Sequence, residues 1–147
     1  MPIAEVIATP ELMEECFGPM SLLVEYDDPK QMLALADVLP GLLAAGIHGN
    51  VGEQIVDELM PRLVAHAGRV LWNGWPTGVA VTWSMQHGGP YPATTAPATT
   101  SVGAASVDRF VRPVTWQGMP QEVLPAPLRD GNPWGISRRV DGVLEVS

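Results

Sequence analysis

The chain has 147 residues, which suits one domain with a core of its own. Its 16 acidic and 8 basic residues give a net charge of −8, and the densest basic cluster is the pair Arg138-Arg139, which argues against a nucleic-acid partner. Charged residues make up only 16% of the chain and hydrophobic residues 46%, so we expect some apolar surface to meet another protein surface.

The first half of the chain alternates apolar runs of strand length with segments of helical periodicity. After a short helix that begins at Pro10, we expect strands over 21–26, 42–49 and 69–75, with helices between Asp28 and Pro40 and between Val51 and Gly68. The strands are nearly continuous apolar runs, as is typical of parallel strands covered on both faces. The predicted fold class is therefore α/β, with a mostly parallel open sheet flanked by helices.

The second half of the chain has a different texture. Residues 76–103 are rich in Gly, Pro, Thr and Ala, and we expect a long loop with a function or a surface to cover. A helix is predicted over about 103–111. The segment "RPVTWQGM" (112–119) resembles a C-terminal edge strand, because Pro113 has no N–H to donate to a ladder. From Pro120 onward an irregular tail is expected.

Cellular location follows from the N-terminus and the cysteine content. The start of the chain lacks the basic region and apolar run of a secretory signal, and no stretch reaches the ~18 apolar residues of a membrane span. Cys16 is the only cysteine, so no internal disulfide can form. We therefore expect a cytoplasmic protein without a membrane partner.

Cys16 is the first candidate for chemistry. A reactive thiolate needs a positive neighbour or a helix N-terminus, but Cys16 follows Glu14 and Glu15 at the end of the predicted short helix. We interpret it as a buried, inert side chain that fills apolar space. A small independent enzyme that uses Cys16 is a rival, which rapid and selective alkylation would support.

Histidines and glycines supply two further motifs. His48, His66 and His87 have no metal-ligand spacing, so no metal site is expected, although His87 lies in the long loop where it could bind a ligand. "GIHGNVG" (46–52) has the wrong glycine spacing for a dinucleotide fingerprint, and a tight turn explains it.

Glu15, Phe17, Gly18 and Pro19 form a more specific motif, Glu-x-Phe-Gly-Pro. The carboxylate can accept hydrogen bonds from two ribose hydroxyls, and the ring can flank a flat heterocycle. The motif is therefore a candidate contact for a nucleotide sugar.

This motif also carries a resemblance to a known family. "EECFGP", "GLLAAGIHG" and "AGRVLWNGW" resemble, in this order, segments of the C-terminal part of the aldehyde dehydrogenase superfamily. "HGGPYPATT" and "RFVRPVTWQGMP" resemble one branch more closely, the bacterial NADP-preferring enzymes that act on α-ketoglutarate semialdehyde (2,5-dioxopentanoate) or on fatty aldehydes. The resemblance runs from about residue 10 to about residue 140.

The resemblance implies a partial aldehyde dehydrogenase catalytic domain. Residues 1–111 would be the C-terminal portion of that domain, and residues 112–147 an oligomerisation strand with an irregular tail. The family's cysteine nucleophile, general base and oxyanion-hole asparagine lie upstream of the Glu-x-Phe-Gly-Pro motif, so no catalytic residue is expected in this chain, and the chain alone is expected to be inactive. Cys16 occupies a variable position inside the motif.

The resemblance also implies site residues. Glu15 would accept hydrogen bonds from the nicotinamide ribose of NADP or NAD, and Phe17 would pack near the nicotinamide. Full cofactor binding would need the family's cofactor domain. The aldehyde tunnel would be lined from two loops, by Asn73, Trp75, His87 and Tyr91.

The expected function is that of a C-terminal fragment of an NAD(P)-dependent aldehyde dehydrogenase, which oxidises an aldehyde to a carboxylate. Its expected partners are another copy of the chain, bound through the C-terminal strand, or the remaining part of the enzyme, together with a small aldehyde substrate. The alternative is a stand-alone, non-catalytic oligomerisation or interaction module derived from that fold.

Overall fold

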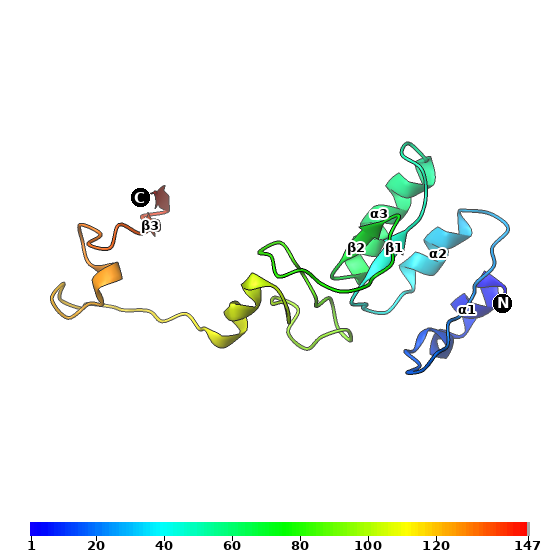
Figure 1. Cartoon of the computed structure of the whole chain (residues 1–147), viewed down its shortest axis with the longest axis horizontal. Helices are drawn as coiled ribbons and strands as arrows, with labels where there is room; N and C mark the ends of the chain where they lie inside the picture. The colour runs from blue at the N-terminus through cyan, green and yellow to red at the C-terminus, as the bar shows by residue number, and fades with distance from the viewer. Residues whose placement is uncertain (147) are drawn as a thin grey trace. The chain divides into compact units, whose positions relative to one another are not determined.

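The computed structural model describes residues 1–146. Two compact units divide the chain between residues 111 and 112. The first unit contains α1 (Ile3–Ala8), η1 (Pro10–Met13), α2 (Gln31–Asp37), β1 (Ala45–Ile47), α3 (Gln54–His66), β2 (Val70–Trp72) and η2 (Ala104–Phe110) (Figure 1). The second contains η3 (Ala126–Leu128), β3 (Arg138–Val140) and β4 (Val143–Glu145). The η elements are short 3₁₀-helices.

A parallel strand pair lies at the centre of the first unit. Ala45 pairs with Val70 and Ile47 pairs with Trp72, and α3 connects the two strands in a βαβ arrangement. α3 packs against α2, and the buried side chains of Ala36, Ile47 and Leu63 form the shared core. The α/β expectation is therefore confirmed for the region between α2 and β2, where helical and strand periodicities are strongest.

The segment 21–26 is not the strand that we expected. Among its residues only Glu25 forms a bridge, in parallel with Pro2. The Glu25 carbonyl accepts a hydrogen bond from the N–H of Ile3, and the N–H of Glu25 donates to the carbonyl of Met1. The N-terminal residues thus lie beside this segment, and α1 (Ile3–Ala8) begins at the residue that bonds to Glu25.

The second unit differs from expectation in two places. The segment 112–119 is extended but pairs with no strand among the described residues, so the predicted edge strand is wrong for this chain by itself. The tail, expected to be irregular, contains the antiparallel hairpin β3–β4, whose turn residues Asp141 and Gly142 have φ of 47° and 83°. Positive φ at both turn positions matches the twist of a two-residue hairpin.

These pairings also correct the predicted sheet. Residues 1–146 form one parallel pair and one antiparallel pair, so the structure does not show a mostly parallel open sheet. The apolar runs 42–49 and 69–75 predict strands longer than those observed, because β1 and β2 have three residues each.

The long loop 76–103 is held by close backbone approach. The N–H of Gly68 donates to the Leu42 carbonyl at 3.2 Å, and a Cβ atom at Gly68 would collide with the carbonyl of Gly88. A Cβ atom at Gly41 would likewise collide with the carbonyls of Pro90 and Tyr91. Glycine at these positions lets the loop lie directly on the chain before β1 and after α3.

Within residues 1–146, no helix combines the length and the apolar composition needed to cross a membrane.

Candidate functional site

One cavity of the first unit is an open groove of about 810 Å³. Its walls come from residues 10–15, residues 38–44 and the loop residues Pro92 and Ala93. Three carboxylates line it, those of Glu11, Glu14 and Glu15, and we call this cavity the acidic groove.

Local backbone geometry places Glu15 in the acidic groove. η1 ends at Met13, and Glu14 follows with φ −68° and ψ 142°, so the chain leaves the 3₁₀-helix in an extended conformation. The carboxylate of Glu15 is exposed and makes no hydrogen bond or ion pair with any residue that the structure describes. Its oxygens are therefore free to accept hydrogen bonds from a ligand.

Phe17 lies differently. Its side chain is 91% exposed and is not among the groups that line the acidic groove. The structure thus brings Glu15, but not Phe17, to this cavity. The roles that we expected for the two residues remain predictions.

Cys16 is exposed, so the prediction that it is a buried filler is wrong. The physical reason lies in the segment after η1, where residues 14–20 are all exposed. Cysteine is usually buried, but residue type alone does not show whether the segment that contains it lies at the surface.

The four predicted tunnel residues do not share one cavity. Asn73, Trp75 and Tyr91 line neither the acidic groove nor the smaller cavity, whereas His87 lines the smaller one. Trp75 and Tyr91 are each 77% exposed, and the ring of Trp75 lies 5.1 Å from that of His48. Asn73 is bound to backbone, with two side-chain hydrogen bonds to Gly49.

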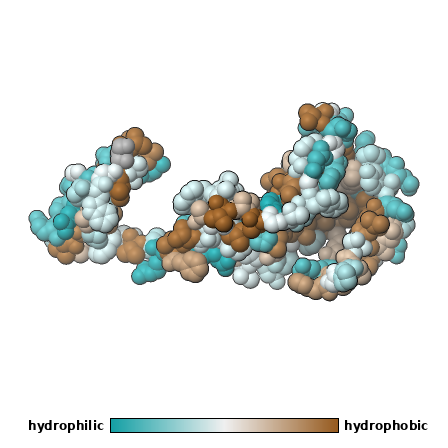
Figure 2. All heavy atoms as spheres, in the orientation of Figure 1, coloured by the Kyte–Doolittle hydropathy of each residue, from teal (hydrophilic) through white to brown (hydrophobic). Residues whose placement is uncertain are grey.

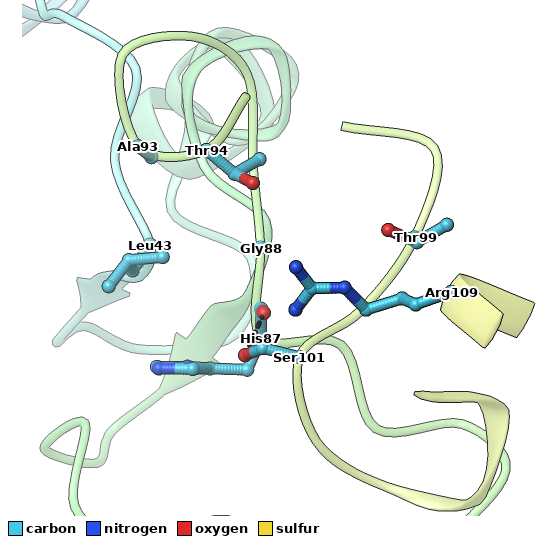
Figure 3. A pocket seen from close by; sticks show the side chains of 8 residues that line it. All are labelled: Leu43, His87, Gly88, Ala93, Thr94, Thr99, Ser101 and Arg109. Carbon is cyan, nitrogen blue, oxygen red and sulfur yellow. Dashed lines mark hydrogen bonds between the residues drawn. The ribbon is translucent and has the colours of Figure 1, made fainter. Parts of the chain in front are cut away.

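The smaller cavity has a volume of about 180 Å³ and lies between the long loop and η2 (Figure 3). Its lining residues are Leu43, His87, Gly88, Ala93, Thr94, Thr99, Ser101 and Arg109. We call it the Arg109 cavity. Sequence reasoning identified only His87, because the other polar residues form no motif and come together through the path of the loop.

His87 is fixed in this loop by its backbone. Its N–H donates to Thr100 Oγ1 at 2.9 Å, and its carbonyl accepts hydrogen bonds from the N–H and the hydroxyl of Ser101. Thr100 is buried, and its hydroxyl also donates a hydrogen bond to the Val102 carbonyl. The Nδ1 atom of His87 is buried and has no partner among residues 1–146.

In the part of the chain that the structure describes, no three His, Cys, Asp or Glu side chains gather as a group that could hold a metal ion.

Many large apolar side chains lie at the surface, as the brown atoms in Figure 2 show. The most exposed include those of Phe17, Val51, Val81 and Phe110. These side chains come from several segments of the chain.

Comparison with curated proteins shows that the chain is homologous to part of a bacterial aldehyde dehydrogenase. It is 46% identical over 136 residues to the α-ketoglutaric semialdehyde dehydrogenase of Acinetobacter baylyi, which covers 92% of this chain and 26% of that enzyme. It is 43% identical over 140 residues to α-ketoglutaric semialdehyde dehydrogenase 2 of Azospirillum brasilense, over 95% of this chain and 27% of the relative. No protein-family model matches the chain.

The resemblance noted in the sequence is therefore confirmed. The chain spans about a quarter of the length of the curated relatives that it matches.

Proposed function

We propose that this chain forms the part of an NAD(P)-dependent aldehyde dehydrogenase that holds the nicotinamide ribose, shapes the aldehyde entrance and contacts a neighbouring subunit. The substrate would be an aldehyde of the α-ketoglutaric semialdehyde type, oxidised to the carboxylate. The homology over more than nine-tenths of the chain carries this proposal.

The acidic groove supports the cofactor contact. The carboxylate of Glu15, a lining residue, offers acceptors for the paired hydroxyls of a ribose, and the cavity volume of about 810 Å³ is ample for a nicotinamide riboside. When bound, the nicotinamide would accept the hydride of the oxidation. The role of this chain is to orient the ribose, which is worth most when the reacting atoms are held close.

The thioester chemistry of such an enzyme needs an activated cysteine. Cys16 is the only cysteine of the chain, it is exposed, and two carboxylates precede it in sequence. The ion pairs of the described residues, Arg62–Asp37 and Arg138–Glu145, do not involve Cys16 or the two glutamates before it. We therefore assign Cys16 no catalytic role and propose that this chain positions ligands without forming the covalent bond.

The segment 112–119 supports a subunit contact. Val114 and Trp116 are exposed, and the backbone of 112–119 has unpaired hydrogen-bonding groups in the described structure. Backbone N–H and C=O groups left unpaired in this way can pair with a strand of another chain. A second copy of the chain, or the rest of an enzyme, would cover it.

A chimera tests the proposal. The matching quarter of the Acinetobacter baylyi relative is replaced by this chain, and NAD(P)H formation from α-ketoglutaric semialdehyde is measured. We expect an active chimera. Glu15→Gln should lower the single-turnover rate of hydride transfer roughly 10- to 100-fold, because a charged hydrogen bond to the ribose is lost.

Glu5→Gln is the matched control, since Glu5 is an exposed glutamate of the same unit that does not line the acidic groove. It should leave the hydride-transfer rate near that of the chimera. A folded chimera without activity would refute the proposed function. An active chimera in which Glu15→Gln changes nothing would refute the role of Glu15 while leaving the family role of the chain intact.

A further inference from the structure

Arg109 presents a guanidinium without a counter-ion. The ion pairs of residues 1–146 are Arg62–Asp37 and Arg138–Glu145, and no hydrogen bond of the described chain involves the Arg109 side chain. Arg109 is an exposed residue, so its guanidinium is accessible to a ligand. Figure 3 shows that it reaches from η2 into the middle of the group of residues around the Arg109 cavity.

Two further donors line the same cavity. Thr94 Oγ1 accepts a hydrogen bond from the N–H of Ala96 at 3.1 Å, which leaves its own proton free to donate. Gly88 is buried, and its N–H donates to no group among the described residues. An N–H group without a partner in the chain can donate to a ligand.

The other hydroxyls of the cavity are already committed as donors. Thr99 donates to the Ala96 carbonyl and Ser101 donates to the His87 carbonyl. No carboxylate lines the cavity. The lining therefore combines one positive charge with neutral donors, which is a receptor for a single anionic group.

We propose that the Arg109 cavity binds the carboxylate group of a small organic acid. The planar fork of a guanidinium matches a carboxylate in bidentate geometry, and Thr94 and Gly88 would satisfy the remaining lone pairs. A volume of about 180 Å³ is small compared with the ~300–1,000 Å³ of drug-sized ligand sites, which limits the ligand to a few carbon atoms. The apolar side chains of Leu43 and Ala93 would cover the carbon chain.

A carboxylate fits better than a phosphate. A phosphate carries up to two negative charges and is usually met by several basic groups or a row of backbone donors, whereas this cavity has one arginine. The proposal does not depend on the proposed enzyme function, because it concerns ligand binding by the chain itself.

The test is a titration of the ¹⁵N-labelled full chain, followed by NMR of its backbone amides. The ligands are succinate, its neutral dimethyl ester and inorganic phosphate. Succinate should shift the amides of Gly88, Thr94 and Ser101 with saturation in the millimolar range, and the dimethyl ester should not. Phosphate should shift them less at equal concentration.

Arg109→Gln should weaken succinate binding about 10-fold or more, because it removes a charged pair of hydrogen bonds. Arg109→Lys keeps the charge but not the fork and should bind several-fold more weakly than the original chain. Arg112→Gln is the matched control, because Arg112 is an exposed arginine nearby in sequence that does not line the cavity.

Equal binding by Arg109→Gln would overturn the proposal, as would shifts spread over other arginines instead of the cavity. Phosphate binding tighter than succinate binding would overturn the choice of a carboxylate and make the cavity a general oxyanion site. The Arg109 side chain makes no hydrogen bond or ion pair within the described chain, and preserved chemical shifts elsewhere will verify that the variants are folded.

Discussion

The side chain of Asn73 closes two hydrogen bonds on the backbone of Gly49. Its Oδ1 atom accepts from the Gly49 N–H at 2.8 Å, and its Nδ2 atom donates to the Gly49 carbonyl at 3.0 Å. Asn73 follows β2 and Gly49 follows β1, so this pair ties together the carboxyl ends of the two parallel strands. Asn73 also has φ of 48°, a conformation that asparagine tolerates better than most residues.

Asn73→Ala should lower the free energy of unfolding by about 1–2 kcal/mol, since two exposed hydrogen bonds are lost and alanine disfavours positive φ. Urea denaturation followed by circular dichroism measures the change. Asn73→Asp keeps the acceptor and loses the donor, so its effect should be intermediate. Full stability in Asn73→Ala would show that this bridge contributes nothing.

Leu63→Ala should destabilise the first unit by about 2–5 kcal/mol, the usual range for removing a buried leucine side chain. Leu63 is 7% exposed and belongs to the core with Ala36 and Ile47. The control is Val64→Ala on the next residue of α3, which is 59% exposed and should change stability by about 0.5 kcal/mol or less. Equal effects of the two substitutions would contradict the observed orientation of α3.

Gly68→Ala should cost about 1–3 kcal/mol, because its new Cβ atom would push against the Gly88 carbonyl. Gly78→Ala is a matched control, since a Cβ atom at Gly78 meets nothing within 4 Å. Amide hydrogen exchange supplies the second measurement: the amides of residues 86–89, among them the His87 N–H that donates to Thr100, should exchange faster in Gly68→Ala and be unchanged in Gly78→Ala. Unaltered protection in both would argue against close packing of the loop.

Trp116→Lys should shift the chain toward smaller assemblies if the segment 112–119 joins subunits as proposed. Trp116 is exposed, and a lysine there would place a charge on the apolar edge. Sedimentation velocity over a range of concentrations gives the distribution of species. Trp134→Lys provides the comparison, because Trp134 is also exposed but lies outside this segment. The same dissociation in both variants would count against a specific strand contact.

Helical periodicity between residues 29 and 67 predicted α2 and α3 because their apolar residues recur on one face and meet around Leu63. The approximate positions of β1 and β2 followed from apolar runs on either side of α3. Their three-residue lengths did not, because strand length depends on a partner that apolar composition does not specify.

The remaining features depend on contacts between residues far apart in sequence. The first residue of α1, Ile3, donates a backbone hydrogen bond to Glu25, and no pattern in the sequence near either residue predicts that pairing. The segment 112–119 has the composition of a strand, but a β-strand forms only when it pairs with another strand. No strand of the described chain pairs with this segment. The sequence predicted Glu15 in the acidic groove and His87 in the Arg109 cavity as site residues. It did not predict Arg109 or Leu43, which line the same cavity only because of the path of the long loop.

The buried core described above is small. Among residues 1–146, six hydrophobic side chains are buried, those of Ile3, Val6, Ala36, Ile47, Leu63 and Ala67. The heat capacity of unfolding and the denaturant slope both scale with the surface that unfolding newly exposes. The isolated chain will therefore show a broad urea transition and a shallow calorimetric peak for its length. Both will sharpen when a larger assembly shields its apolar surface, so calorimetry can report on assembly without any enzymatic assay.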